Sequence, residues 1–321
     1  MILVTGGTGF IGSHLVERLA AEGRPVRCLV RRTSSLGCLP PAAECAQGDL
    51  ESGTGLDEAL RGVDTVIHLA GATKARTPAD YTSANATATA NLLDRAGDVR
   101  RFVHVSSLAA AGPSQGGRAL SEQDEPHPVS HYGRSKLAGE QAVLESPLAS
   151  RAVIVRPPVV YGPRDRDVFQ MIRAVSHGWI LQIGSVQRYL SLVYVQDLVS
   201  GLLAAADGAV GGRVFYLAHP TPISWAEFGN TAARLMGRRV RTLAIPEAAA
   251  YALGWCAEWG ARLSGKPGIL SRDKVAEACC AGWVCDPGRA CRELGFAAPT
   301  GLEEGLRQSL DWYKEAGWLK F

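Results

Sequence analysis

The sequence predicts a doubly wound α/β fold, with a parallel sheet at its centre and a smaller, mostly helical C-terminal cap. Two observations predict it. Short runs that are apolar throughout alternate with helical patterns in the first half of the chain, and a glycine-rich turn joins the first run to the first helix. Strands without a polar side are typical of a parallel sheet that helices cover on both faces. Ligands bind such a sheet at the carboxyl ends of its strands, near the point where the strand order reverses.

The apolar runs and the helical patterns place the predicted elements along the chain. We expect strands at residues 1–5, 25–30, 65–70, 102–106, 152–156 and 191–195, and helices at 11–22 and about 82–95. After about residue 218 the pattern becomes mostly helical and richer in tryptophan. The sequence therefore predicts a first domain over residues 1–160, to which 185–218 return, and a substrate-binding cap made of 161–184 and 219–321.

The composition is that of an ordinary globular protein and argues against several functional classes. Of 321 residues, 46% are apolar and 20% are charged, the net charge is +3, and no run of basic residues exceeds a pair. A basic face for nucleic acid is therefore not expected. The eight cysteines form no Cys-x-x-Cys pair and no zinc-ligand pattern with histidine, which indicates reduced thiols and no metal site. Because we find no signal peptide and no apolar span of about 18 residues, we expect a cytoplasmic protein.

The most informative local pattern is the turn Thr-Gly-Gly-Thr-Gly-Phe-Ile-Gly at the end of the first predicted strand. Gly6, Gly9 and Gly12 follow one another at intervals of three residues between a predicted strand and a predicted helix. This arrangement lets the backbone turn sharply, approach a pyrophosphate closely and point helix N–H groups at it. We therefore expect a dinucleotide-binding Rossmann domain rather than a tight turn without a ligand.

The end of the second predicted strand indicates which dinucleotide binds. An acidic residue at this place accepts a hydrogen bond from a ribose 2′-hydroxyl and repels a 2′-phosphate, but here the chain carries Arg31 and Arg32. Two arginines favour NADP over NAD. The alternative is that one or both side chains are simply solvated.

Tyr132 and Lys136 form a candidate acid–base site. Residues four apart on a helix share one face, so the ammonium of Lys136 can lie beside the phenol of Tyr132. A neighbouring cation favours the phenolate and brings a pKa that is ordinarily about 10 closer to neutral pH. Ser107 stands at the end of another predicted strand, where its hydroxyl can hydrogen-bond a substrate oxygen while Tyr132 exchanges the proton.

Together these motifs resemble the extended short-chain dehydrogenase/reductases, the family of NAD-dependent epimerases and dehydratases. The resemblance covers almost the whole chain, with the motifs in the family's order. It rests on Thr5–Gly12, Gly48–Leu50, His68–Gly71, Asn85, Phe102–Ser107, Tyr132-x-x-x-Lys136 and Arg156–Pro163. It implies that Ser107, Tyr132 and Lys136 are catalytic, that the register of the motif favours Ser107 over the alternative Ser106, and that the protein is a homodimer.

The resemblance also implies which residues bind NADP or NAD. The segment 48–50 is expected to contact adenine, residues 68–71 to lie under the adenosine and ribose, and Asn85 and 156–163 to lie on the nicotinamide side. The expected cofactor-binding residues are Gly6, Gly9, Phe10, Ile11, Gly12, Arg31, Arg32, Asp49, Leu50, Leu69, Ala70, Gly71, Asn85, Tyr132, Lys136 and Pro158.

Three departures from the family pattern separate this chain from enzymes that act on nucleotide sugars. Val159 takes the place of an asparagine, and Leu190 takes the place of an arginine that clamps the nucleotide phosphate, with Arg188 nearby as a partial substitute. Leu108 and Ala109 take the place of the Asp-Glu pair of the sugar 4,6-dehydratases. Losing a bidentate cation and a polar amide weakens a phosphate site, so Val159 and Leu190 favour a more apolar substrate. With Leu108 and Ala109 in place of the Asp-Glu pair, an acid–base dehydration lacks its groups.

The C-terminal part resembles the 3β-hydroxysteroid dehydrogenase and dihydroflavonol reductase branch more than the sugar epimerases. Segments 283–286, 293–296 and 302–305 are similar to that branch. In addition, an apolar stripe with a spacing of four residues lies on a predicted helix and comprises Tyr251, Trp255, Trp259 and Leu263. This stripe is a packing face of the cap, a lid over an apolar substrate, or a face that contacts a membrane.

The sequence therefore predicts an NAD(P)-dependent oxidoreductase that interconverts a ketone and a secondary alcohol on a bulky, largely apolar small molecule, sterol-like or polycyclic. Hydride transfer at carbon is paired with proton exchange by Tyr132 at oxygen. Two alternatives stay open: a nucleotide-sugar 4-epimerase with tightly bound NAD, and a non-catalytic NADP-binding protein. The fold alone does not decide between them.

Overall fold

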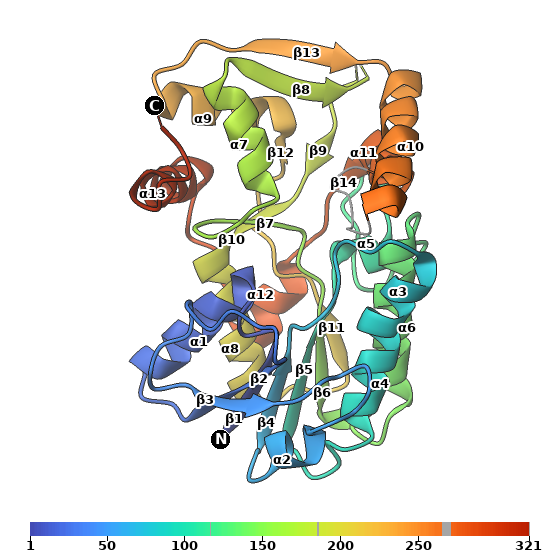
Figure 1. Cartoon of the computed structure of the whole chain (residues 1–321), viewed down its shortest axis with the longest axis vertical. Coiled ribbons are helices and arrows are strands. Elements are labelled where there is room, and N and C mark those ends of the chain that lie inside the picture. The colour runs from blue at the N-terminus through green and yellow to red at the C-terminus, as the bar shows by residue number, and fades with distance from the viewer. Residues whose placement is uncertain (116, 185, 265–270, 321) are drawn as a thin grey trace.

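The computed structural model describes residues 1–115, 117–184, 186–264 and 271–320, with the side chains of all of these except 260–264. At its centre lies a seven-stranded parallel sheet with strand order β11-β6-β5-β4-β1-β2-β3 (Figure 1). Its strands are β1 (Ile2–Thr5), β2 (Val26–Val30), β3 (Glu44–Gln47), β4 (Thr65–His68), β5 (Arg101–Val105), β6 (Ala152–Val155) and β11 (Arg213–Phe215). Strand β1 pairs with both β2 and β4, so the strand order reverses at β1, and the predicted doubly wound fold is confirmed.

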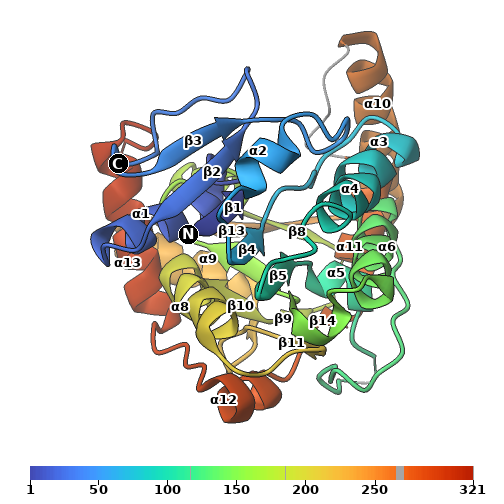
Figure 2. The same ribbon diagram turned by 90° about the horizontal axis from the view of Figure 1, so that it is seen from below.

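Helices cover both faces of this sheet (Figure 2). One layer contains α1 (Phe10–Ala21) and α8 (Val195–Asp207), and the other contains α2 (Leu56–Leu60), α4 (Ala88–Leu93) and α6 (His131–Glu145). Alternate residues of β1 point to opposite faces, so Ile2 and Val4 pack with the first layer while Leu3 packs with the second. Because both faces are buried, the central strands are apolar throughout, and this makes them recognisable in the sequence.

The predicted helix over about 82–95 is interrupted by a wider turn. It consists of α3 (Pro78–Thr82), a π-helical turn η1 (Ser83–Thr87) and α4. Thr77 and Asp80 start α3 with a capping box, in which each side chain accepts a hydrogen bond from the backbone N–H of the other. Single π turns inside helices are frequent at functional sites, and this one carries Asn85.

Two strands of the central sheet, β3 and β11, were not predicted from the sequence, and a third predicted strand lies outside this sheet. Strand β3 lies at the edge of the sheet and exposes Glu44, Cys45 and Gln47, so it has no continuous apolar run, and β11 has only three residues. The strand expected at 191–195 exists as β10 (Leu192–Tyr194). It pairs with β7 (Val159–Tyr161) outside the central sheet, so its expected place in that sheet is wrong.

The remaining elements gather mostly above the sheet in Figure 1. They include a parallel pair, β8 (Trp179–Ile183) with β13 (Arg241–Ile245), and a small sheet of β9 (Tyr189–Leu190), β12 (Ile223–Ser224) and β14 (Gly282–Trp283). Their helices are α5 (Leu108–Ala111), α7 (Val168–Ser176), α9 (Trp225–Leu235), α10 (Glu247–Ser264), α11 (Arg272–Cys279), α12 (Gly288–Leu294) and α13 (Leu302–Glu315), and a short 3₁₀ turn spans Ala149–Arg151. The sequence pattern did not indicate the two small sheets. The division of the chain into two domains stays a prediction.

The aromatic stripe of α10 faces solvent. Tyr251, Trp255 and Trp259 are 39%, 50% and 50% exposed, whereas Gly254 packs against the start of α11, where a Cβ would lie 3.1 Å from the backbone N of Arg272. The interpretation of the stripe as a packing face is therefore wrong for these three residues, and the side chain of Leu263 lies outside the described residues. Within the part of the chain that the structure describes, no helix combines the length and the apolar character needed to cross a membrane.

Candidate active site

The glycine turn after β1 packs too tightly to accept side chains. Gly6 has a φ of +73°, in the left-handed region, and a Cβ on it would lie 2.7 Å from the backbone N of Ala70. A Cβ on Gly12 would lie 2.2 Å from the carbonyl oxygen of Gly6. Gly9 begins α1 without a side-chain cap, so no capping side chain occupies the first N–H groups of that helix. Backbone N–H groups in this arrangement bind a pyrophosphate.

A cleft of about 580 Å³ lies at this end of the sheet. It is lined by the glycine turn, by residues that follow β2, β3 and β4, and by residues of α3, η1 and α4. Eight of the expected cofactor-binding residues line it, namely Gly6, Gly9, Arg31, Asp49, Leu50, Leu69, Ala70 and Gly71. The other eight do not line it, namely Phe10, Ile11, Gly12, Arg32, Asn85, Tyr132, Lys136 and Pro158.

Several lining residues escaped the sequence-based expectation. They are Thr8, Leu29, Ser34, Glu51, Ala72, Lys74, Ala75, Arg76, Asp80, Ser83, Ala84 and Ala88, whereas Gly48, which also lines the cleft, belongs to the segment expected to contact adenine. Those at 72–76 continue the loop after β4, so the rule that ligands bind at the carboxyl ends of strands points to this loop. The lining of the cleft and the close-packed glycines fit a dinucleotide, whose pyrophosphate would be held at the start of α1 and whose adenosine would be held by residues that include Arg31 and Asp49.

Asn85 fixes the far end of this loop to α6. Its Oδ1 accepts a hydrogen bond from Ala72 N at 2.8 Å, and its Nδ2 donates to Ala72 O at 3.0 Å and to Ser135 Oγ at 2.9 Å. A Cβ on Gly71 would lie 2.5 Å from Asn85 Oδ1 and 3.7 Å from Lys136 Nζ. Asn85 therefore stabilises the loop behind the cleft by linking Ala72 to Ser135. Gly71, which lines the cleft, lies close to the ammonium of Lys136.

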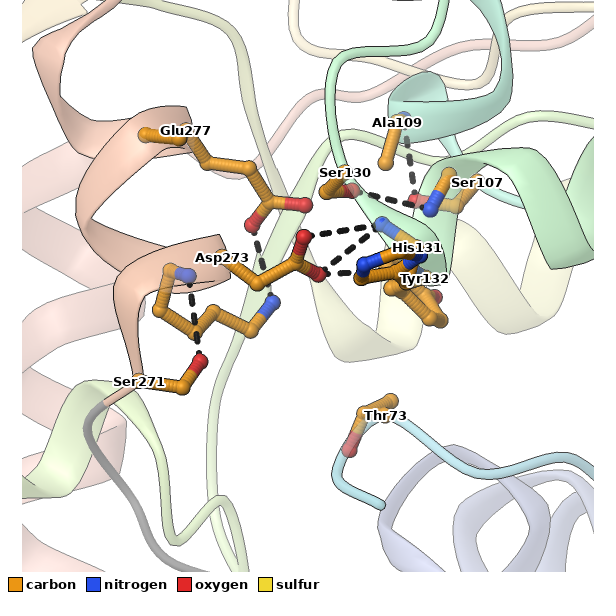
Figure 3. A network of polar contacts seen from close by, with 12 residues as sticks. Thr73, Ser107, Ala109, Ser130, His131, Tyr132, Ser271, Asp273 and Glu277 are labelled. Carbon is orange, nitrogen blue, oxygen red and sulfur yellow. Dashed lines mark hydrogen bonds and ion pairs between the residues drawn. The ribbon is translucent and has the colours of Figure 1, made fainter. Parts of the chain in front are cut away.

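Ser107 and Tyr132 meet beside this end of the cleft. Ser107 begins α5, where its Oγ accepts a hydrogen bond from Ala109 N at 3.1 Å (Figure 3). Burial raises the pKa of the Tyr132 phenol, and the side chain of Ser107 lies close enough to oppose that rise. Because the cap uses Oγ as an acceptor, the hydroxyl proton of Ser107 remains available to a partner on the Tyr132 side.

Ser106, the alternative serine, is committed to a buried network. Its hydroxyl donates to Glu140, whose carboxylate pairs with the guanidinium of Arg156 at 2.9 Å and 2.6 Å. Arg156 also donates to the Tyr216 hydroxyl at 3.3 Å. The geometry therefore favours Ser107 as the serine that reaches a substrate. Sequence reasoning missed Glu140, because a glutamate on a helix is ordinarily solvated.

Lys136 lies under the cleft, buried and turned toward β5. Its Nζ donates to the carbonyl oxygen of Val105 at 2.8 Å, and burial lowers its pKa to about 8, although the charge of Glu140 acts in the opposite direction. For Tyr132 the expectation of a lowered pKa is not met, since burial raises the pKa of this phenol. The cation with the largest effect on Tyr132 is Lys274 of α11, not Lys136.

The residues that depart from the nucleotide-sugar pattern are apolar and at least half-buried in the structure, and the nearby Arg188 is already paired with a carboxylate. Leu108 and Ala109 are buried in α5, and Leu190 is buried in the apolar core that includes Ile223 and Phe228. Val159, at the start of β7, is half-buried against that core. Arg188, expected as a partial substitute for a phosphate clamp, donates to Glu247 at 2.7 Å and to the Ile183 carbonyl oxygen.

No group of three or more His, Cys, Asp or Glu side chains in the described ranges is arranged to hold a metal ion.

His68, at the end of β4, is a buried structural residue. Its Nδ1 lies 2.6 Å from Thr5 Oγ1 and its Nε2 lies 3.0 Å from Thr89 Oγ1, and burial lowers its pKa to about 3. This ring is therefore neutral at physiological pH.

Comparison with known proteins agrees with the geometry of the site. The model of the NAD-dependent epimerase/dehydratase family matches residues 2–218. A ceramide reductase from Caulobacter vibrioides is 32% identical, over 99% of this chain and 96% of the relative. A 4-hydroxy-2-methyl-3-oxo-4-farnesyl-3,4-dihydroquinoline-1-oxide ketoreductase from Stigmatella aurantiaca is 31% identical, over 98% of this chain and 96% of the relative. The solved structure of MoeE5 in complex with UDP-glucuronic acid and NAD is 29% identical, with a TM-score of 0.78 and coverage of 98% and 99% of the two chains.

The relatives also include proteins named 3β-hydroxysteroid dehydrogenase and UDP-glucose 4-epimerase. The family match covers more than half of the chain, and two relatives exceed 30% identity over nearly its whole length. The resemblance seen in the motifs is thereby confirmed. The chain belongs to the NAD-dependent epimerase/dehydratase family, and it is an enzyme of the extended short-chain dehydrogenase/reductase type.

Proposed function

We propose that this enzyme interconverts a ketone and a secondary alcohol on a bulky, largely apolar small molecule, with NADP as the preferred cofactor. The observation that carries the proposal is the close approach of Ser107 to Tyr132, with Lys136 on the same helix as Tyr132 and directly behind Gly71 of the cleft lining. These three side chains supply a hydrogen-bond donor, a proton-exchanging phenol and a cation within one site. Together they suit acid–base chemistry at a carbonyl oxygen.

In the reductive direction, the carbonyl carbon gains a hydride and its oxygen gains a proton. A nicotinamide cofactor supplies this hydride when it is bound. Tyr132 donates its phenolic proton to the substrate oxygen as the C=O bond becomes a C–O single bond. Ser107 donates a hydrogen bond to the same oxygen and stabilises the negative charge that develops there. Lys136 would hold the ribose hydroxyls on the nicotinamide side through its ammonium, as the family resemblance implies.

Two of three features support an apolar substrate, and the third, the loss of the Asp-Glu pair, argues against a dehydration. The residues at the places of the sugar and phosphate ligands are Val159 and Leu190, the Asp-Glu pair of the dehydratases is replaced by Leu108 and Ala109, and Arg188 is paired with Glu247. Two relatives above 30% identity carry names that combine a keto or reductase activity with a ceramide or a farnesyl group. A long-chain or polycyclic ketone agrees with both kinds of observation.

The preference for NADP rests on one side chain that lines the cleft. Arg31 follows β2, close to Asp49 and Leu50 in the lining, whereas Arg32 does not line the cleft. A guanidinium at this place donates charge-assisted hydrogen bonds to a 2′-phosphate. Of the two arginines, Arg31 is therefore the one that we assign to cofactor choice.

The test is the turnover of purified protein with NADPH and a panel of long-chain and sterol-like ketones, in the wild type and in Tyr132→Phe. Loss of the phenolic proton is expected to slow turnover about 10²- to 10⁴-fold, while NADPH binding measured by calorimetry is retained. Tyr81→Phe is the matched control, because its ring lies 6.1 Å from that of Tyr132 and it lacks the contact with Ser107. Wild-type turnover in Tyr132→Phe would remove the proposal.

A second candidate function is a nucleotide-sugar 4-epimerase, which the relative named UDP-glucose 4-epimerase and the likeness to MoeE5 bound to UDP-glucuronic acid and NAD favour. This activity regenerates its cofactor in every cycle. It predicts NAD that stays bound through purification, interconversion of a UDP-sugar with its epimer, and no net consumption of NADPH with any ketone. The same panel, extended by UDP-glucose and UDP-glucuronic acid, separates the two functions.

A further inference from the structure

Helix α11 is attached directly to the start of the helix that carries Tyr132. Both carboxylate oxygens of Asp273 accept hydrogen bonds from His131 N, at 2.9 Å and 3.0 Å, and one of them also lies 3.5 Å from Tyr132 N (Figure 3). Ser271 starts α11 by accepting a hydrogen bond from Lys274 N at 3.2 Å. The first turns of α6 and α11 are therefore held together, although 141 residues separate Asp273 from Tyr132 in the chain.

This attachment places Lys274 over the phenol. Its Nζ lies 4.9 Å from the centroid of the Tyr132 ring and donates to Glu277 Oε2 at 2.9 Å. The side chains of Lys274 and Glu277 are 31% and 15% exposed, so the pair is largely shielded from water. A shielded ammonium on a ring face attracts the ring more strongly than a solvated one does, and it favours a negative charge on the phenolic oxygen.

Glu277 holds this ammonium from one side and is itself fixed in place. The indole Nε1 of Trp283 donates to the carbonyl oxygen of Glu277 at 2.8 Å. Only one carboxylate oxygen of Glu277 pairs with Lys274. The other, Oε1, is buried without a hydrogen-bond partner among the described residues. The carboxylate therefore opposes ionisation of Tyr132 while it positions the cation that favours it.

The groups that face Tyr132 come from three places besides its own helix. Lys274 and Glu277 come from α11, Tyr81 comes from α3, and the hydroxyl of Ser107 comes from the start of α5. On α6 itself, Lys136 is turned away toward Val105 O. Lys274 is thus the ammonium that packs on the phenol, and Glu277 is the carboxylate that faces it.

We propose that Lys274 is a positioning residue for Tyr132, which fixes the phenol ring toward Ser107 and stabilises its ionised form, with Glu277 as the counter-charge. The proposal rests on the proposed role of Tyr132 as the proton-exchanging group. It gives α11 a part in the reaction that the motifs Tyr132-x-x-x-Lys136 and Ser107 do not contain. Loss of the Lys274 cation raises the pKa of Tyr132, and loss of the Glu277 charge lowers it.

These opposite signs allow a test that a purely structural role would not pass. The measurement is the ionisation of Tyr132, followed as tyrosinate absorbance up to the pH at which the far-ultraviolet circular dichroism shows unfolding. Because the chain has eight tyrosines, a matching Tyr132→Phe variant is subtracted in each case. In Lys274→Met the ionisation should move up by about one pH unit, in Glu277→Gln it should move down, and Lys274→Arg should resemble the wild type.

The pH dependence of kcat/KM for a ketone that is turned over supplies the second readout, and its bend should move in the same directions. A shift of the same sign in Lys274→Met and Glu277→Gln, or no shift in either, would overturn the proposal. Thermal melting and NADPH titration of each variant show that it is folded and binds cofactor. If Tyr132→Phe keeps full turnover while the absorbance shifts occur, the proposed function fails and the effect of Lys274 on the phenol stands.

Discussion

The carboxylate of Glu140 and the guanidinium of Arg156 form a bidentate ion pair, which contacts Ser106 at the end of β5. Their side chains are 2% and 5% exposed, and Glu140 also accepts a hydrogen bond from the hydroxyl of Ser106. The pair joins α6 to the end of β6, and so it links the helix of Tyr132 and Lys136 to the central sheet. The charge of Glu140 also opposes the effect of burial on the pKa of Lys136.

We expect Glu140→Ala to lower the free energy of unfolding by about 3–5 kcal/mol, because it leaves a guanidinium buried without its carboxylate. Urea denaturation measures this loss. The matched control is Asp207→Ala, which removes the partner of Arg24 at a site where the two side chains are 53% and 27% exposed. The control should cost less than about 1 kcal/mol. Equal losses in the two variants would mean that the buried pair has no special weight in stability.

The second prediction concerns proton uptake on cofactor binding. Burial lowers the pKa of Lys136 to about 8, so the free protein releases this proton as the pH rises through about 8. An ammonium next to a negatively charged cofactor is favoured over the neutral amine. Binding of NADPH at about pH 9 should therefore take up about one proton, and binding at about pH 6.5 should take up almost none.

Calorimetric titration in two buffers with different ionisation enthalpies measures this uptake directly. Lys136→Met is the control, since it has no group that titrates at this place and its proton uptake should be nearly absent at both pH values. Uptake in the variant equal to that of the wild type would assign the proton to another group.

Local motifs made part of the site predictable, because their chemistry needs short and fixed spacings. The turn from Gly6 to Gly12 and the pair of Tyr132 and Lys136 each lie within one turn or one helix, so periodicity and residue type identify them. The cleft contains the glycine turn, Arg31 and the loop after β4, where the rule for parallel sheets places a ligand.

The contacts between α11 and the start of α6 could not be predicted from the sequence, for a physical reason. No spacing relates Asp273 and Lys274 to Tyr132, and their contact depends on how the chain returns from the cap to the start of α6. Glu140 was equally hidden, since only the burial that the fold imposes distinguishes it from an ordinary solvated glutamate. Edge strand β3 escaped because its largely exposed residues form no apolar run, and the pairing of β8 with β13 escaped because it joins two short segments that lie far apart in the chain.

The last prediction separates the two arginines that follow β2. Arg31 lines the cleft and Arg32 does not, although both side chains are exposed and adjacent in the chain. A charge-assisted contact with a 2′-phosphate contributes about 1.5–3 kcal/mol, so Arg31→Ala should weaken NADPH binding about 10- to 100-fold. NADH binding should change little in the same variant, because NADH has no phosphate at this place.

Arg32→Ala, the matched control, should leave both affinities close to those of the wild type. Calorimetric titration of the three proteins with both cofactors measures the ratio of affinities. A loss of NADPH affinity in Arg32→Ala that equals the loss in Arg31→Ala would mean that the two charges act through their general field and not through a contact. An unchanged ratio of NADPH to NADH affinity in Arg31→Ala would remove the structural basis for a preference for NADP.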